Sequence, residues 1–486
     1  MEHQLLIGKY TLESLTSGLY VSPLDLYREY VQNASDSIDK AIDEGLISGE
    51  RAVIKIETDA VKRVIRITDN GTGVSSKNVM QALIDIGNSH KRNSQCRGFR
   101  GIGRLSGLGY CRKLRFVTSA YGESVATIVS YDCEVLHELL SPKRGNHDTV
   151  DDVLQQVMSV DSFTERKKLH YFVVELSDID NDSCLLDKDK VLSYLQQNLP
   201  IPYAKDFVWG TLINEKMRQA SCEISSYNIQ FNYNDEKLAL FKPYMNAVLS
   251  DRMRRIEDRI SEIRFRKFYI GNVLSAVLWY AETSYLGTVL NNDIKGIRIR
   301  QGNILIGDNT SLRKQFKEER FSGWLIGELH VLDERIVPNT RRDGYEENAF
   351  YEELMDQFAG WAVEISKEIR HKSYVRSLSQ QEKAVLEQPK AIDTLSVLKN
   401  QTLVNASELD IDDMDESESV ANGDLLKQLS ILMNMGKKIT KYNVLNVNPK
   451  MTIEQKQTVA RIFDILYDNY SKTKANGIVQ SILENF

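Results

Sequence analysis

The sequence predicts an α+β protein of two or three domains. Its 486 residues exceed the size of one typical domain. The composition, with 42% hydrophobic and 27% charged residues, is that of an ordinary soluble chain. Amphipathic helical periodicity, strongest over residues 26–42, alternates with strand-like apolar runs, which begin at residues 52–56 and 64–67. These two patterns together predict the mixed architecture.

Residues 26–42 predict a helix with one apolar face and one polar face. At about 100° per residue, the apolar stripe contains Tyr27, Tyr30, Val31, Ala34, Ile38, Ala41 and Ile42. The opposite face aligns, one turn apart, Glu29, Asn33, Asp36 and Lys40. Asparagine is a mediocre helix former, so this polar face indicates either a functional site or a solvated surface. The start of the helix is predicted by Ser22 as N-cap, Pro23 at the first helical position and Asp25 in a capping box.

A short turn, Asp69-Asn70-Gly71-Thr72-Gly73, follows the run at residues 64–67, which can pair with residues 52–56. An aspartate at the end of a buried strand can accept a hydrogen bond from an exocyclic amine such as that of adenine. Gly71 and Gly73 let the backbone turn tightly and approach a flat ligand. An ordinary Asp-Asn-Gly turn is the alternative interpretation.

A third motif places Gly98, Gly101 and Gly103 in the spacing G-x-x-G-x-G ahead of an apolar run. The motif differs from the dinucleotide fingerprint and lacks the Gly-Lys-Ser/Thr ending of a phosphate loop. Glycines that lead into a predicted helix make an anion cradle, because exposed N–H groups and a helix N-terminus favour phosphate. Positive charge is added by Arg97, Arg100 and Arg104. A flexible surface loop is the alternative.

In this order, the three motifs resemble the GHKL ATPases, the superfamily of gyrase, heat-shock chaperone, histidine kinase and mismatch-repair protein. Arg28-Glu29 with Asn33-Ala34-Ser35-Asp36, and the later Ile86-Gly87-Asn88-Ser89, are most similar to the ninety-kilodalton heat-shock chaperones. The resemblance covers roughly residues 15–120. It implies an N-terminal Bergerat-type α/β sandwich that binds ATP and Mg²⁺, with a lid at roughly residues 80–105.

The resemblance also implies a role for each matching residue. Glu29 matches the general base that activates the attacking water, Asn33 the magnesium ligand, and Asp69 the carboxylate that reads adenine. Nucleotide binding is expected from Asn33, Asp36, Asp69, Gly71, Gly73, Ser89, Gly98, Arg100, Gly101 and Gly103. The strand expected at residues 170–176 has no clear match to the threonine that often supports the adenine site.

A second, α+β domain is predicted to begin near residue 187. Strand-like runs lie at residues 296–300, 303–306 and 324–331, and residues 345–372 predict a helix. Residues 251–267 are rich in arginine but interleaved with acids. We predict a helix with internal ion pairs there, in preference to a nucleic-acid contact.

The segment Ile336–Asp343 resembles the chaperone middle-domain loop in which an asparagine and an arginine reach the γ-phosphate. Alignment on Pro338 and Asn339 makes Arg342 the better match and leaves Arg341 one residue off. Arginine suits this role because its planar fork stays charged and binds phosphate oxygens in pairs. An exposed loop with two arginines is the alternative.

The C-terminal part predicts an acidic linker and a helical module. Residues 400–426 contain no Lys or Arg and carry a cluster of acids. Helical periodicity follows at residues 425–437 and 452–485, where an apolar stripe suits either a partner helix or packing on the same chain. The predicted domains are thus 1–186 (ATP-binding), 187–372 (middle), 373–424 (linker) and 425–486 (helical module).

The composition limits which cellular compartments and which classes of partner are expected. The net charge of −6 gives no global argument for nucleic acid. Five dispersed cysteines without C-x-x-C spacing fit reduced cytosolic thiols. The most apolar stretch, residues 268–281, is too short to span a bilayer, and no signal peptide is evident. A cytoplasmic protein without a membrane anchor is expected.

The functional prediction is a magnesium-dependent ATPase whose nucleotide cycle remodels protein clients, as a homodimer, in the manner of the chaperones it resembles. An ATP-driven clamp that serves a partner enzyme, on DNA or in defence, is the competing prediction and leaves nucleic-acid binding open. A histidine kinase is disfavoured because the ATP module is N-terminal here. Residues 372–486 contain no histidine, which disfavours a mismatch-repair endonuclease.

Overall fold

The computed structural model describes residues 8–15, 22–84, 103–141, 148–251, 253–377 and 478. Residues 1–366 form one compact unit, which contains two separate large sheets. Of the second unit, residues 367–486, the structure describes the end of one helix and Ile478. The predicted acidic segment and C-terminal helices lie outside the described residues, apart from Ile478.

The first sheet has eight strands in the order β5-β4-β3-β6-β2-β1-β7-β8. Their bounds are β1 Ile54–Asp59, β2 Val64–Asp69, β3 Lys113–Ser119, β4 Val125–Asp132, β5 Met158–Thr164, β6 Tyr171–Ser177, β7 Ile229–Tyr233 and β8 Glu236–Leu238. All neighbours are antiparallel except β1 and β7. The predicted hairpin of residues 52–56 and 64–67 is confirmed, with Ile56 opposite Ile67.

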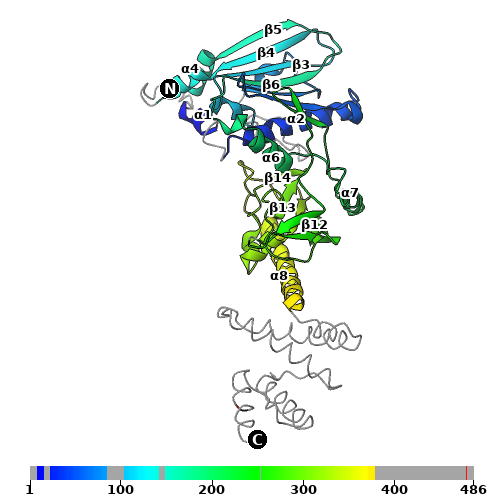
Figure 1. Cartoon of the computed structure of the whole chain (residues 1–486). Helices are drawn as coiled ribbons and strands as arrows, with labels where there is room; N and C mark the ends of the chain where they lie inside the picture. The colour runs from blue at the N-terminus through cyan, green and yellow to red at the C-terminus, as the bar shows by residue number, and fades with distance from the viewer. Residues whose placement is uncertain are drawn as a thin grey trace. The chain divides into compact units, whose positions relative to one another are not determined.

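Helices cover one face of this sheet, and α2 and α6 lie side by side on it (Figure 1). The helices of this part are α1 Tyr10–Leu15, α2 Asp25–Asp43, α3 Val79–Ile84, α4 Cys133–Leu140, α5 Val150–Val157 and α6 Lys188–Asn198, with short 3₁₀ turns η1 Gly49–Arg51, η2 Gly103–Gly109 and η4 Cys184–Leu186. The apolar stripe of α2 packs on β1 and β2, with Tyr27 and Val31 fully buried. Burial of each large apolar side chain is worth about 1.5–3 kcal/mol, so this stripe fixes the rotation of α2 on the sheet.

The start of α2 differs from the prediction by two residues. The helix begins at Asp25, and Leu24 rather than Ser22 is the N-cap residue. The side chains of Ser22 and Asp25 still accept backbone hydrogen bonds within the preceding turn. The Asp25 carboxylate accepts from the Ser22 N–H at 3.3 Å, and the Ser22 hydroxyl accepts from the Leu24 N–H at 3.3 Å. Three i→i+3 backbone bonds tighten this turn, so the α-helical pattern starts later.

The second sheet has five strands in the order β11-β12-β15-β13-β14. The bounds are β11 Glu262–Ile270, β12 Val273–Glu282, β13 Gly296–Gln301, β14 Ile304–Ile306 and β15 Ile326–Val331, with the hairpin β9 Ala247–Ser250 and β10 Ile256–Arg259 beside it in sequence. The other elements are α7 Gly210–Gln219, α8 Ala349–Ser377, η5 Arg313–Gln315 and η6 Glu319–Trp324. Phe358 and Trp361 of α8 pack on Phe268 and Tyr280 of the sheet. The predicted strands and the predicted helix of this region are confirmed.

The predicted helix at residues 251–267 is wrong, because this segment forms β10 and the start of β11. Arg259 pairs with Glu257 at 2.8 Å and Arg264 with Glu262 at 3.4 Å, two residues apart along a strand face. The ion pairs expected between helical turns are therefore replaced by pairs with the spacing of a strand. Pairing along the whole of β12, whose centre is fully buried, outweighs the local charge pattern.

The chain returns to the first sheet after α6 and α7. β7 pairs in parallel with β1, and β8 extends the sheet by one more strand. Residues 229–238 therefore belong to the first sheet, although they follow the predicted boundary at residue 186. The boundaries at 186, 372 and 424 stay predictions.

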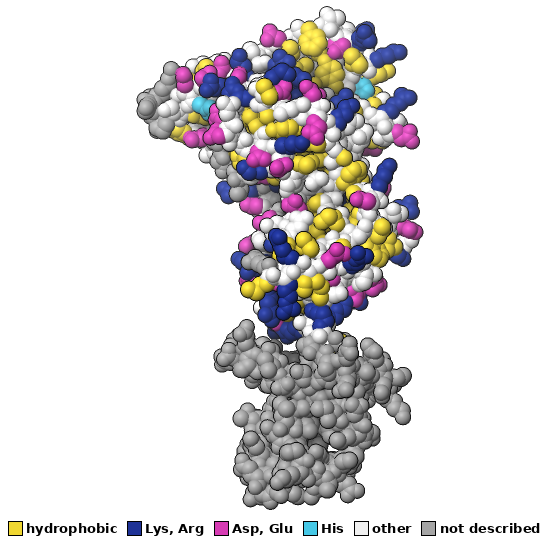
Figure 2. All heavy atoms as spheres, viewed as in Figure 1, with side chains coloured by type: hydrophobic (Ala, Val, Ile, Leu, Met, Phe, Trp, Pro, Cys, Tyr) yellow, Lys and Arg dark blue, Asp and Glu magenta, His cyan; other side chains and the backbone are white. Residues whose placement is uncertain are grey.

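Basic and acidic side chains are interleaved on the face of the molecule that Figure 2 shows. Within the described part of the chain, no helix is long and apolar enough to cross a membrane. Cys111, Cys133, Cys184 and Cys222 are free thiols, and three of them are buried.

Candidate nucleotide and catalytic site

The helix α2 carries the candidate catalytic residues on its least buried face. Glu29 and Asn33 are half-buried there, one turn apart, and Asp36 follows with 8% exposure. Their common face results from the helical repeat, while the opposite stripe holds the helix on the sheet. In this arrangement the carboxylate can accept a hydrogen bond from a water molecule, and the carboxamide oxygen can bind a cation that prefers oxygen ligands.

The turn after β2 lies against the other end of α2. The Asp69 carboxylate is 4% exposed and accepts from the Gly71 N–H at 2.9 Å. Gly71 packs against Ser37 of α2, and any side chain at residue 71 would overlap the Ser37 side chain. Gly73 has φ of +63°, and a Cβ there would overlap the Ser119 carbonyl oxygen. Both positions require glycine, so the backbone here can lie close to a ligand.

Two residues that sequence reasoning missed hold this turn in place. Thr118 of β3 accepts from the Val74 N–H at 2.8 Å and donates to the Tyr171 carbonyl at 3.0 Å. The His170 Nδ1 donates to the Gly71 carbonyl at 2.6 Å, since a carbonyl can only accept. Thr118 lies opposite Phe172, which lies opposite Asp69, so the three share one row across the sheet. No local pattern distinguishes this threonine from any other strand threonine.

Gly103, the last glycine of the motif, lies beside Glu29 of α2. A Cβ at Gly103 would lie 2.5 Å from Oε2 of Glu29, so only glycine fits beside the carboxylate. The Tyr30 hydroxyl donates to the Arg104 carbonyl at 3.1 Å and accepts from the Gly107 N–H at 2.9 Å. Burial raises the pKa of Tyr30 well above its usual range, which keeps the phenol protonated as a donor.

The helix predicted after this motif is a 3₁₀ helix, η2, rather than an α-helix. Its three glycines lower helix propensity, and the Tyr30 contacts favour the tighter turn. The predicted binding residues Ser89, Gly98, Arg100 and Gly101 lie outside the described residues.

A loop of the second region reaches the same glutamate. Arg342 Nε lies 3.8 Å from Glu29 Oε1, and its side chain is 12% exposed. Arg28 Nη2 donates to the Arg341 carbonyl at 3.1 Å and lies 3.4 Å from Glu29 Oε1. The side chain of Arg341 is exposed, whereas its backbone is the part that contacts α2. Of the two candidate arginines, the structure therefore brings Arg342 to Glu29.

The backbone of this loop is held in an unusual conformation. Arg342 has φ of +57°, a left-handed value that is uncommon for a residue with a side chain. The Arg342 N–H donates to the Asn339 carbonyl at 3.2 Å, and the Gly307 N–H donates to the Arg342 carbonyl at 2.9 Å. Asn339 also donates to Asp343 at 2.6 Å. These bonds hold the strained residue, and strain of this kind is concentrated at functional sites.

The described residues fit a nucleotide with its metal. Asp69 supplies a buried carboxylate and the Gly71–Gly73 backbone a close approach at one end of α2, while Glu29 and the half-buried Asn33 supply oxygens at the other. Ser37 lies eight positions after Glu29 in the helix, which is about 12 Å along the axis. The candidate site is therefore elongated, with the Asp69 carboxylate at one end and Glu29 and Asn33 at the other.

The candidate residues of α2 and of the Asp69 turn lie in a part of the chain that is similar to known proteins. The family described as "Histidine kinase-, DNA gyrase B-, and HSP90-like ATPase" matches residues 27–159. The chaperone protein HtpG of Shewanella denitrificans is 27% identical over 144 residues, which is 26% of this chain and 23% of that protein. HtpG of Polaromonas naphthalenivorans is 30% identical over 114 residues, 20% of this chain and 18% of the relative. The chain thus spans about a fifth of the length of the curated relatives it matches.

The matched region contains nearly all of α2, the Asp69 turn, η2 and four of the eight strands of the first sheet, β1 to β4. The second sheet, the Arg342 loop and α8 lie beyond it. Residues 27–159 thus match the family of histidine kinase-, DNA gyrase B- and HSP90-like ATPases.

Proposed function

We propose that the protein is a magnesium-dependent ATPase whose catalytic site is completed by the second region of the chain. The observation that carries this proposal is the approach of Arg342 to Glu29, because it places a cation from the second region at the candidate general base. The family of residues 27–159 supports ATP as the substrate. A γ-phosphate at this end would then meet a carboxylate from one region and a guanidinium from the other.

In the proposed reaction, Glu29 orients a water molecule and accepts its proton during attack on the γ-phosphate. Arg342 stabilises the negative charge on the transferred group. Asn33 would hold Mg²⁺, which, when bound, neutralises charge on the phosphates. Asp69 accepts from the adenine amine, and the backbone at Gly71 and Gly73 lies beneath the base.

The substitution Asp69→Asn tests the nucleotide assignment. The amide can present a donor toward the adenine amine, so two donors would face each other and one would be left unpaired. We expect ATP binding to be lost in isothermal titration, while the circular dichroism spectrum and melting temperature stay close to wild type. Asp59→Asn, at the far end of the paired strand β1, is the matched control and should bind ATP normally. Wild-type ATP affinity in Asp69→Asn would contradict the assignment.

For the biological output, we propose nucleotide-driven remodelling of protein clients by a cytoplasmic homodimer. The support is the name of the relatives, which are chaperones, and the similarity is confined to the ATPase domain. The same nucleotide cycle can instead drive a clamp for one partner enzyme. Capture of partners by ATP-loaded Glu29→Ala distinguishes the two, because a chaperone retains many unrelated proteins and a clamp retains one partner in fixed ratio.

A further inference from the structure

Helix α6 contacts both the catalytic helix and the second sheet region. Toward α2, the Tyr194 hydroxyl donates to Asp25 Oδ1 at 2.8 Å. Toward the second region, Ser193 and Gln197 donate to Asp293 Oδ1 at 3.1 and 2.9 Å. Adjacent side chains of one short helix therefore hold two different parts of the protein.

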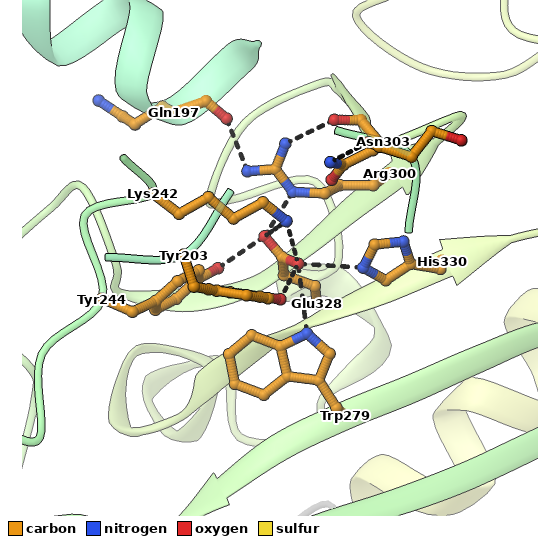
Figure 3. Close-up of polar contacts among 10 residues, drawn as sticks. Gln197, Tyr203, Lys242, Tyr244, Trp279, Arg300, Asn303, Glu328 and His330 are labelled. Atoms are coloured by element: carbon orange, nitrogen blue, oxygen red, sulfur yellow. Dashed lines mark hydrogen bonds and ion pairs between the residues drawn. The ribbon is translucent and has the colours of Figure 1, made fainter. Parts of the chain in front are cut away.

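The C-terminal end of α6 is attached to the centre of the second sheet. Arg300 Nη2 donates to the Gln197 carbonyl at 2.7 Å, and its Nε donates to Glu328 (Figure 3). A cation is favourable at this position because the last carbonyls of a helix carry partial negative charge. Glu328 is fully buried and accepts further bonds from Lys242, Tyr203, Tyr244, Trp279 and His330. Arg300 is thus held rigidly, and so is the end of α6.

On the other side, Asp25 transmits the position of α6 to the catalytic residues. The Asp25 carboxylate accepts from Tyr194 and lies 3.5 Å from Arg28 Nη1. The other terminal nitrogen of Arg28 contacts Glu29 and the Arg341 carbonyl. Arg28 is 4% exposed, so few orientations are open to its guanidinium. Because Asp25 contacts one terminal nitrogen of the Arg28 guanidinium, it also orients the other terminal nitrogen toward Glu29.

We propose that α6 sets the orientation of Glu29 and of the Arg342 loop, with Tyr194 as a positioning residue that acts through Asp25 and Arg28. The inference rests on the proposed ATPase function. It assigns the coupling between the two regions to α6, in addition to the direct contact of the loop. A displacement of the second sheet relative to α2 would reach Glu29 by this route, since polar contacts join the second region to α6 and α6 to Asp25, Arg28 and Glu29, and the helix α6 itself joins the two sets.

Tyr194→Phe tests the inference, because it removes a single hydroxyl and keeps the ring. We expect the turnover number for ATP to fall about 3- to 10-fold, the value of one hydrogen bond, while the Kd for ATP is unchanged. Tyr227→Phe is the matched control: Tyr227 donates to Asp39 on the same helix at 2.7 Å, ten residues beyond Glu29. It should turn over ATP like wild type.

If the Tyr194 hydrogen bond were purely structural, its loss would lower the free energy of unfolding. It would not lower the turnover number at an unchanged Kd for ATP. The double variant Tyr194→Phe with Arg28→Lys supplies the second criterion. If Tyr194 acts through Arg28, the two losses in turnover should not multiply. Asp293→Ala reaches α6 from the second region and should give the same loss of turnover at unchanged Kd, which keeps the inference testable if Tyr194→Phe does not fold.

The outcomes separate this inference from the proposed function. If the wild-type protein does not hydrolyse ATP, the proposed function is overturned and the inference with it. If the wild type hydrolyses ATP and Tyr194→Phe matches Tyr227→Phe, only the inference is overturned. If the two losses in turnover multiply in the double variant, Tyr194 does not act through Arg28, and the inference is again overturned.

Discussion

Glu29 in the first region and Glu328 in the second both contact arginine, but the two carboxylates differ in burial and in the closeness of their contacts. The Glu29 side chain is 13% exposed, and its charged neighbours lie at 3.4 and 3.8 Å. The Glu328 side chain is fully buried, and its partners other than Arg300 lie between 2.8 and 3.2 Å. Glu29 is therefore partly accessible and has long contacts to its neighbours, whereas Glu328 is inaccessible and all its acceptor sites are occupied.

The difference shows what each carboxylate can do. A carboxylate with all its acceptor sites occupied cannot take up a proton or a water molecule, so Glu328 serves the structure. Its pKa is lowered well below the usual range, because the charges of Arg300 and Lys242 outweigh the burial that opposes ionisation. Glu29 keeps accessible surface, and its contacts at 3.4 and 3.8 Å leave acceptor capacity for a water molecule, as the proposed role of general base needs. Charge clustering alone would not have separated the two roles.

The largest effect is expected from Glu328→Gln. The amide keeps the shape but leaves Arg300 and Lys242 without a buried counter-charge, and removal of one partner of a buried pair costs about 3–5 kcal/mol. The free energy of unfolding, measured with urea, should fall by that amount. Glu257→Gln is the control, since its pair with Arg259 is exposed and should contribute less than about 1 kcal/mol. Equal losses in the two variants would refute the structural role of Glu328.

Glu29→Ala should lower ATP turnover and leave stability nearly unchanged, the reverse of the effect expected for Glu328→Gln. We expect ATP hydrolysis to slow about 10²-fold or more, with ATP affinity and the free energy of unfolding close to wild type, because the residue is half-buried and loosely paired. Glu44→Ala, an exposed glutamate that follows the same helix, is the control and should keep full turnover. Wild-type turnover in Glu29→Ala would mean that the open carboxylate is not the base.

Arg342→Ala should slow hydrolysis at least about tenfold while sparing ATP affinity, since its charge acts on the transition state. Charge-stabilising arginines in other NTPases reach about 10³ or more. Arg341→Ala is the neighbouring control and is expected to be milder, because only its backbone carbonyl contacts α2. A steady-state phosphate-release assay measures both. A larger loss for Arg341 would reverse the assignment.

The smallest effect is expected in the pH dependence of the free energy of unfolding, through Lys242 in the buried cluster around Glu328. Burial, together with the Arg300 charge, lowers the pKa of Lys242 to about 7, although Glu328 acts in the opposite direction. The unfolded lysine titrates near its ordinary value of about 10.4. Between these values the unfolded chain binds more protons, so the Lys242 contribution to the free energy of unfolding rises with pH.

Lys242→Met removes this contribution. The stability of the wild type relative to Lys242→Met should therefore increase from pH 7 to 8.5, by at most about 1.4 kcal/mol per pH unit. The range stops below 9 because the nearby Cys222 thiol, whose pKa burial raises to about 12, affects the balance at higher pH. A flat or falling difference across this range would show that Lys242 stays charged in the folded protein.

The features that the sequence predicted well are local. The helical repeat around Glu29 and the glycines after Asp69 depend on neighbours within a few residues, and the structure places both as expected. Arg342 was found only through resemblance, since nothing near it in the sequence indicates that Glu29 lies 3.8 Å away. Its catalytic role, like that of Glu29, stays a prediction.

The features that sequence reasoning missed depend on distant pairing. Tyr194 is 169 residues from its acceptor Asp25, and Arg300 is 103 residues from the Gln197 carbonyl. The error at residues 251–267 has the same origin, because charge spacing favoured a helix while the partner strand β12 decided for a strand. Local periodicity reports propensity, and tertiary pairing can override it.

The place of β7 beside β1 determines how this protein can be divided into fragments. β7 covers the edge of β1 from Ile54 to Thr58 with a parallel ladder. A recombinant piece that stops at residue 186 would uncover that ladder and present a row of unpaired N–H and C=O groups to other chains, which invites aggregation. A piece that ends after Leu238 would keep the strand and its cover β8, at the cost of carrying α7 away from its packing partners. Biochemistry on the ATP-binding part alone will therefore depend on where the cut is made.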